Sequence, residues 1–168
     1  MDLNYTNSKS MEEVTIEEVM KFDDFALIWL KNFPVGHGDI VLLLTTLAEQ
    51  AININQLLQV TDRQGLGQLI FTVPSGGLAA VLVIVERFCH SMPAVKYGYS
   101  QDITRIVLTG SGIRTHSQVA AEILDLLEND DIRMHMIGSS EISLSIYVDR
   151  EQAEETVNLL RQRFINAD

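Results

Sequence analysis

The chain has little cysteine, little positive charge and no long hydrophobic run. Its 168 residues include one cysteine, Cys89, and 12 lysines and arginines against 23 aspartates and glutamates, for a formal net charge of −11. A single cysteine cannot form an internal disulfide, which favours a reducing compartment. The acidic balance argues against binding to nucleic acid or to an anionic membrane surface, because both attract clustered cations.

Membrane and export signals are also missing from the sequence pattern. The longest apolar run, Leu78 to Val85, is far shorter than the roughly 20 residues that a membrane helix needs. The N-terminal segment MDLNYTNSKS is polar and lacks the apolar core of a signal peptide. The sequence therefore predicts an acidic cytoplasmic protein.

The residues that usually hold metals are scattered. Cys89 has no CxxC partner, and the four histidines share no spacing typical of metal ligands. They are His37, His90, His116 and His135. We therefore expect no metal and no cofactor, and we expect Cys89, on the apolar side of a helical pattern, to pack in the core.

The chain contains an internal repeat. Phe25–Gln59 aligns with Arg105–Ser139 at a constant offset, and Leu69–Val73 aligns with Leu144–Val148 at a shorter one. The change of offset places extra residues within the turn-like stretch Val60–Gly67, where a hairpin tip tolerates insertion. Internal repetition of this size indicates two copies of one structural unit.

Each repeat has the pattern strand, helix, strand, strand, helix. Apolar residues recur at helical spacing from Ile40 to Ala51 and from Leu78 to Cys89, whereas Ile142–Val148 alternates with period two. Two such units predict an α+β protein made of two ferredoxin-like βαββαβ sandwiches, each an antiparallel sheet with two helices on one face.

A βαββαβ unit needs a fourth strand. The first repeat has one in Ala94–Tyr99, followed by the turn Ser100–Asp102, but the second repeat ends soon after Phe164. Glu13–Lys21 has strand-like alternation, and an unpaired sheet edge is a liability. We therefore predict that the N-terminal strand completes the second sheet and interlocks the domains; the alternative is a loose N-terminal tail.

The predicted domain limits follow from this topology. They are a polar tail at 1–12, the N-terminal strand at 13–24, the first domain at 25–100 and the second domain at 101–168.

Several motifs resemble a known family. The stretch LTGSGIRTHSQVAAEILDLLENDDIRMHMIGSSEISLSIYVDREQAEETVNLLRQRF, Leu108 to Phe164, resembles the second ACT domain of aspartate kinases without a gap, most specifically at Ser140–Glu141–Ile142. In the first repeat, LAEQAININ and FTVP resemble the first ACT domain. The resemblance covers nearly the whole chain, and no length remains for the kinase domain.

The resemblance implies regulation rather than catalysis. Paired ACT domains of aspartate kinases bind threonine or lysine and give feedback control of lysine, threonine and methionine biosynthesis. The chain has the size of a separate regulatory subunit, and a regulatory fragment of a longer kinase would look the same. The edge strand, the apolar first helix and the resemblance predict a homodimer, and a separate catalytic subunit is a further expected partner. The alternatives are a stand-alone ACT repeat that senses another metabolite and a degenerate pair that serves only in oligomerisation.

Polar residues near the first helix are candidate ligand groups for a free amino acid. Glycines and helix-start N–H groups can approach a carboxylate, and side-chain amides both donate and accept. The candidates in the first repeat are Gly36, His37, Gly38, Asp39, Asn53 and Gln59, with the two amides placed on the strand after the helix. The alternative interpretation is an ordinary helix entry, with Asp39 as N-cap and two exposed amides.

Other candidates rest on the resemblance alone. The family's site lies between two chains, which makes Ser139, Ser140 and Glu141 expected contacts across the interface. The aspartate that holds the ligand ammonium in the family is Val35 here. Arg133 replaces an asparagine; pairing with Glu141 or Asp131, contact with a ligand carboxylate, and plain solvation are its alternatives.

Two other functions of this fold are disfavoured. An acylphosphatase needs a loop arginine, for which Arg114 is available, and an asparagine where Arg133 stands. A nucleic-acid module of this topology needs exposed aromatic residues on its sheet and basic charge, and we expect neither here. The sequence also lacks a Gly-rich phosphate loop followed by lysine, so the chain alone is not expected to phosphorylate aspartate.

Overall fold

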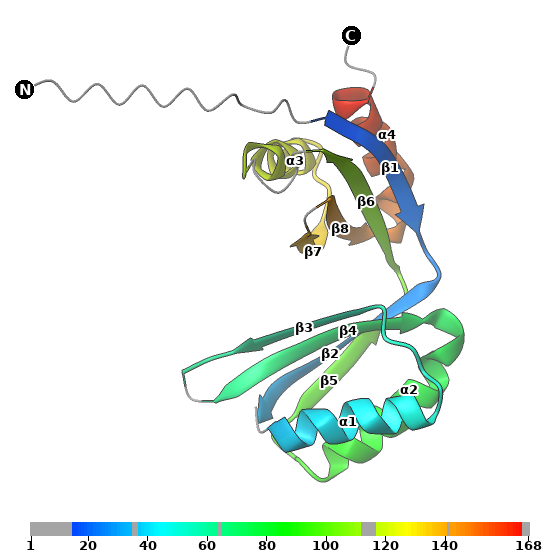
Figure 1. Ribbon diagram of the computed structural model, residues 1–168, viewed down its shortest axis with the longest axis vertical. Coiled ribbons are helices and arrows are strands. Elements are labelled where there is room, and N and C mark those ends of the chain that lie inside the picture. The colour runs from blue at the N-terminus through cyan, green and yellow to red at the C-terminus, as the bar shows by residue number, and fades with distance from the viewer. Residues whose placement is uncertain (1–14, 35–36, 64, 112–116, 141, 166–168) are drawn as a thin grey trace, which may run out of the picture. The chain divides into compact units, whose positions relative to one another are not determined.

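The computed structural model describes residues 15–34, 37–63, 65–111, 117–140 and 142–165. The chain divides into two compact units (Figure 1). The first unit is Phe22–Ile103, and the second combines Met1–Lys21 with Thr104–Asp168. The second unit is therefore built from both ends of the chain. The predicted domain limits stay predictions.

The first unit is an antiparallel sheet with two helices on one face (Figure 1). The sheet order is β3-β4-β2-β5. The strands are β2 (Phe25–Pro34), β3 (Gln56–Thr61), β4 (Leu66–Pro74) and β5 (Lys96–Ser100), and the helices are α1 (His37–Glu49) and α2 (Leu78–His90), with a 3₁₀ turn at Ser75–Gly77 before α2.

The second unit repeats this architecture with one strand borrowed from the N-terminus. Its sheet order is β1-β6-β8-β7, so β1 lies beside β6 and completes the sheet as predicted (Figure 1). The strands are β1 (Thr15–Phe22), β6 (Ile103–Ser111), β7 (Met134–Ser139) and β8 (Ser143–Asp149), and the helices are α3 (Ser117–Asn129) and α4 (Ala153–Phe164), with a 3₁₀ turn at Arg150–Gln152.

Alternating residues of each sheet form the core against the helices. In β2, Ala26, Ile28 and Leu30 are fully buried with Leu43 and Leu47 of α1. In the second unit, Ile16 and Val19 of β1 join the core formed by the other strands, α3 and α4. Burial of the period-two and helical apolar stripes explains why the sequence pattern predicts the elements. Cys89 is buried in the first core, which confirms its predicted packing role.

Corresponding turns close α1 and α3. Ala51 and Asp131 have φ values of 53° and 54°, in the left-handed region. The N–H of the next residue donates to the carbonyl five residues back in both cases, Ile52 to Leu47 at 3.0 Å and Ile132 to Leu127 at 2.8 Å. This pattern is the Schellman motif, in which glycine is the usual left-handed residue. The repeat is thus preserved at the level of backbone conformation.

Two local expectations are wrong. Asp39 is the third residue of α1 rather than its N-cap, because the helix already begins at His37. Asn53 lies in the connection between α1 and β3, not on the strand, because β3 starts only at Gln56. No helix in the described part of the chain is long and apolar enough to cross a membrane.

Candidate functional site

The start of α1 carries the first group of candidate residues. His37, Gly38 and Asp39 form its first turn, where N–H groups lack an acceptor within the helix and attract negative charge. Gly38 is exposed, and a Cβ built on it would have nothing within 4 Å. Asp39 is half-buried and is the acidic residue of the first turn. The helix start is therefore accessible to a ligand, with one carboxylate beside it.

Gln59 lies toward the same end of the sheet. It pairs with Leu69, while Thr61 pairs with Gly67 and Gly67 pairs with Phe33, near the end of β2 that leads into α1. The Gln59 side chain is exposed, and its Nε2 donates to Thr61 Oγ1 at 3.4 Å. Its amide oxygen is therefore oriented by a contact within β3 and remains able to accept a hydrogen bond.

Asn53 lies at the opposite end of the first unit. The neighbouring Asn55 N–H donates to the Thr72 carbonyl at 2.9 Å, and Thr72 pairs with Leu27 near the start of β2. The thirteen residues of α1 span about 20 Å between the two ends. Within one chain, the fold brings Gln59 but not Asn53 toward Gly38 and Asp39.

The β7–β8 hairpin carries the second group of candidates. Ser139 ends β7 and Ser140 begins the turn, and both are exposed. Ser140 N–H donates to the Ser143 carbonyl at 2.8 Å, Ser143 N–H donates to Ser140 Oγ at 3.1 Å, and the two hydroxyl oxygens lie 2.7 Å apart. Ser140 therefore shapes the turn. Ser139 occupies the position in its repeat that Gln59 occupies in the first.

Some predicted positions fall outside the described residues. These are Val35, Gly36, Arg114, His116 and Glu141.

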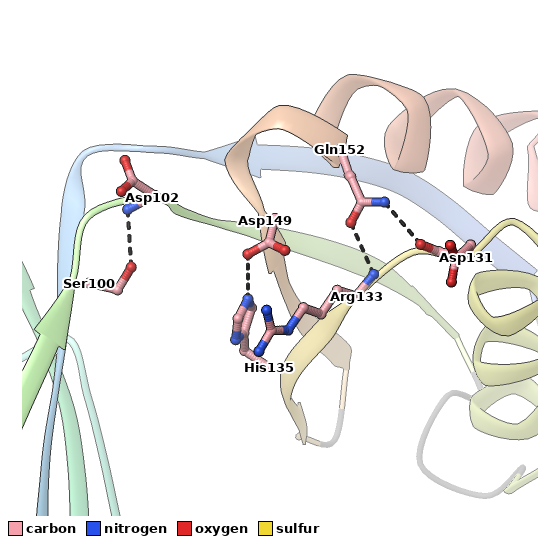
Figure 2. A network of polar contacts seen from close by, with 7 residues as sticks. All are labelled: Ser100, Asp102, Asp131, Arg133, His135, Asp149 and Gln152. Carbon is pink, nitrogen blue, oxygen red and sulfur yellow. Dashed lines mark hydrogen bonds and ion pairs between the residues drawn. The ribbon is translucent and has the colours of Figure 1, made fainter.

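A polar network that the sequence analysis missed surrounds Arg133 (Figure 2). The Gln152 amide donates to the Asp131 carbonyl at 3.0 Å and accepts from Arg133 N–H at 3.0 Å. His135 Nε2 lies 2.6 Å from Asp149 Oδ1. Figure 2 shows the Arg133 side chain extending toward the His135–Asp149 pair and away from Asp131. These contacts join β7, β8 and the start of α4.

The register of β7 explains why periodicity could not reveal the histidine pair. The pairing with β8 shifts between Met134 and Met136, so His135 is the extra residue of a β-bulge. A bulge re-aims one side chain without leaving a composition signal. Figure 2 also shows the Ser100–Asp102 turn, in which Asp102 N–H donates to Ser100 Oγ at 3.2 Å, as expected at the end of β5.

Among the described residues, burial shifts the pKa of Cys89 and of Tyr147. Desolvation raises the pKa of the Cys89 thiol. Desolvation also raises the pKa of Tyr147, against an opposing effect of the nearby Arg105. In the described ranges, histidine, cysteine and acidic residues form no group of three or more that could hold a metal.

Comparison with known proteins assigns the architecture. Residues 106–164 match the ACT domain family. An aspartokinase from Helicobacter pylori is 31% identical over 114 residues, which are 68% of this chain and 28% of the relative. An aspartokinase from Corynebacterium efficiens is 22% identical over 156 residues, which are 92% of this chain and 37% of that relative. The chain thus spans well under half the length of these curated relatives.

Solved structures share both units of the fold. The regulatory subunit of aspartate kinase from Thermus thermophilus matches 89% of this chain and 99% of its own, with a TM-score of 0.80 and 23% identity. A structure of aspartokinase alpha and beta subunits gives a TM-score of 0.79 and 25% identity over the same share of this chain. The chain is a tandem ACT-domain protein related to the regulatory region of aspartate kinases.

Proposed function

We propose that the chain is an allosteric regulatory module that binds threonine or lysine between two copies of itself. The observation that carries this proposal is the exposed Gly38 in the first turn of α1, with Asp39 in the same turn and Gln59 toward the same end of the sheet. This end of the first unit offers N–H donors, a carboxylate and an amide. The match to aspartate kinase regulatory domains supports an amino acid as the ligand.

The ligand's two charges fit this position in a defined orientation. Its carboxylate would lie at the first turn of α1, where Gly38 leaves space for close approach. Its ammonium would be held by Asp39 and by the Gln59 carbonyl oxygen. The partner copy would add its β7–β8 hairpin, with the Ser139 hydroxyl as the contact and Ser140 holding the turn. A contribution from Asn53 or Glu141 stays a prediction.

The first unit also carries a surface suited to a homodimer. The outward residues of α1 include Val41 and Leu42, 59% and 58% exposed, and the helix has no charged residue from Ile40 to Ala48. The adjacent edge strand β3 exposes Leu57 and has no charged or proline residue to discourage pairing. An uncharged helix face beside an open strand edge favours association with a second copy.

The module is proposed to act on a separate aspartate kinase catalytic subunit in the cytoplasm. The fold matches a regulatory subunit over 99% of that subunit's chain, which supports this proposal. Feedback control would follow if effector binding changed the pairing of the two copies and thereby biased the kinase between two states.

Isothermal titration calorimetry with threonine and with lysine tests the proposal. We expect weak binding of one of them in the wild type. Restoring a carboxylate with Val35→Asp should tighten binding roughly tenfold to a hundredfold, since a charge-assisted hydrogen bond contributes about 1.5–3 kcal/mol. Gln59→Ala should weaken binding, whereas Gln162→Ala on the exposed side of α4 should not.

The contrary result is equally specific. If neither amino acid binds the wild type or Val35→Asp while the dimer persists, the threonine or lysine assignment is wrong. The stand-alone module that senses another metabolite, or that only oligomerises, then takes its place. Val35, where the family has an ammonium-binding aspartate, is the observation that favours this second candidate.

A further inference from the structure

The first sheet has a face turned away from α1 and α2. Because Ala26, Ile28 and Leu30 enter the core, Leu27, Trp29 and Lys31 of β2 point to the other side. Strand pairing places their neighbours in rows across this face. In the row through Leu27, Leu27 and its partner Thr72 are buried and the edge positions are half-buried. The row through Trp29 is partly exposed, and the row through Lys31 is exposed. The solvent exposure of this face therefore increases from Leu27 toward Lys31.

Trp29 lies against a glycine in the middle row. Gly98 is its partner on β5, and a Cβ built on Gly98 would lie 2.5 Å from Trp29 Cζ2 and 2.7 Å from Cε2. The indole therefore occupies the space that any other side chain on Gly98 would fill. Trp29 is partly exposed, which leaves an aromatic surface on the face. It is also the protein's one tryptophan.

Two cations face each other in the exposed row. Lys31 pairs directly with Lys96 across β2 and β5, and both side chains are exposed. In the described part of the chain, neither ammonium lies within ion-pair distance of a carboxylate. Like charges directly opposite on neighbouring strands destabilise a sheet. Their juxtaposition in a protein of net charge −11 points to an anion that neutralises both.

We propose that this face binds a nucleoside monophosphate. The base stacks on Trp29, and the phosphate lies between the ammonium groups of Lys31 and Lys96, with the exposed Gln68 amide beside Lys31 in the same row. Successive rows on one face are about 6.6 Å apart along the strand. One ribose spans a distance of this order between base and phosphate.

Charge and shape select this ligand class over two others. A phosphate monoester carries close to two negative charges at neutral pH, which matches two lysines better than the single charge of an aromatic carboxylate. A nucleic-acid strand needs a cationic surface that extends along its backbone, and the acidic chain does not provide one. The inference stands apart from the amino-acid site at α1, which lies in the other layer of the unit.

Tryptophan fluorescence of the intact protein reads out this site directly. Titration with AMP should quench Trp29 emission saturably. Adenosine, which lacks the anion, and ribose 5-phosphate, which lacks the base, should each bind at least tenfold more weakly, ribose 5-phosphate being measured by competition. The double variant Lys31→Gln, Lys96→Gln should weaken AMP binding at least tenfold.

The matched control removes a cation elsewhere. Arg87→Gln changes an exposed cation in the last turn of α2, in the opposite layer, and should leave AMP binding unchanged. Equal affinity for AMP and adenosine, equal loss in the Arg87 variant, or tighter binding of N-acetyltryptophan than of AMP would each overturn the proposal. No quenching by AMP at millimolar concentration would overturn it as well.

Discussion

Single residues hold the two helix ends in conformations that favour glycine. Ala51 takes the left-handed φ of 53° at the end of α1. A non-glycine residue in that region costs roughly 1–2 kcal/mol, only partly offset by the greater flexibility that glycine gives the unfolded chain. We expect Ala51→Gly to raise the free energy of unfolding by about 1 kcal/mol in urea denaturation.

A second alanine-to-glycine change in the same helix separates the effect of the left-handed φ from the general effect of introducing glycine. Ala48 is exposed and helical, so Ala48→Gly should lower the free energy of unfolding by about 0.5–1 kcal/mol. If both variants lower stability equally, strain at Ala51 does not exist.

The buried thiol predicts a pH dependence. Burial raises the pKa of Cys89 in the folded state, so folding favours the protonated thiol. This contribution to stability is complete below the ordinary thiol pKa and disappears as the pH rises through the folded-state pKa. Wild type should therefore lose more unfolding free energy than Cys89→Ala over this alkaline range. Parallel curves for the two proteins would contradict this.

At the scale of elements, one side chain links the start of α4 to the α3–β7 connection. Gln152 bonds the Asp131 carbonyl and the Arg133 N–H, both at 3.0 Å. With about 0.5–1.5 kcal/mol for each hydrogen bond, Gln152→Ala should lower the free energy of unfolding by about 1–2 kcal/mol. The control Gln162→Ala, on the exposed side of α4, should stay within about 0.5 kcal/mol of wild type. If Gln152→Ala lowers the free energy of unfolding no more than Gln162→Ala does, Gln152 does not stabilise the link between these elements.

Helices and strands were predictable from the sequence where buried apolar residues recur at a regular spacing. The stripes of α2 and β8 show this, and β1 was placed because a βαββαβ unit leaves an edge for it. Contacts that depend on register were not predictable. Trp29 meets Gly98 only through the pairing of β2 with β5, which are far apart in sequence, and His135 turns toward Asp149 only because of a bulge.

The candidate site shows the same division between what local sequence determines and what it does not. Residue types near α1 predicted ligand chemistry, but the helix begins three residues earlier than an N-cap at Asp39 requires, which places Asp39 in the first turn. Asn53 and Gln59 are close in sequence, yet β3 carries Gln59 toward the α1 start and leaves Asn53 behind at the other end. The separation of these side chains depends on where the helix and the strand begin and end, which the local sequence motif does not determine.

At the scale of the whole molecule, the N-terminal strand belongs to the unit that follows the other in sequence. Val19 is 2% exposed in the core of the second unit. Val19→Ala should lower the stability of that unit by about 2 kcal/mol through lost burial and a cavity. Faster amide hydrogen exchange in β6 and β8 of this variant would show the loss of stability. Val83→Ala, at a site 55% exposed, should leave that exchange unchanged. Unaltered exchange in the Val19 variant would argue against a shared core.

Association of two copies is the last expected property of the whole molecule. The outer positions of α1 are Val41, Leu42, Thr45 and Ala48, whereas the matching positions of α3 are Ala121, Glu122, Asp125 and Glu128. The acidic helix repels its own copy, so the first unit is the better self-complementary surface. Analytical ultracentrifugation at micromolar concentration should give about twice the chain mass of 18.8 kDa.

A charged substitution on that surface should separate the copies. Leu42→Glu places a carboxylate near its symmetry mate and removes exposed apolar area, so the mass should fall toward one chain while the circular dichroism spectrum stays unchanged. Val83→Glu makes the same kind of change on an exposed position of α2 and should leave the dimer intact. A wild-type mass of one chain would remove the dimer. Loss of the dimer in the Val83 variant alone would move the interface from α1 to α2.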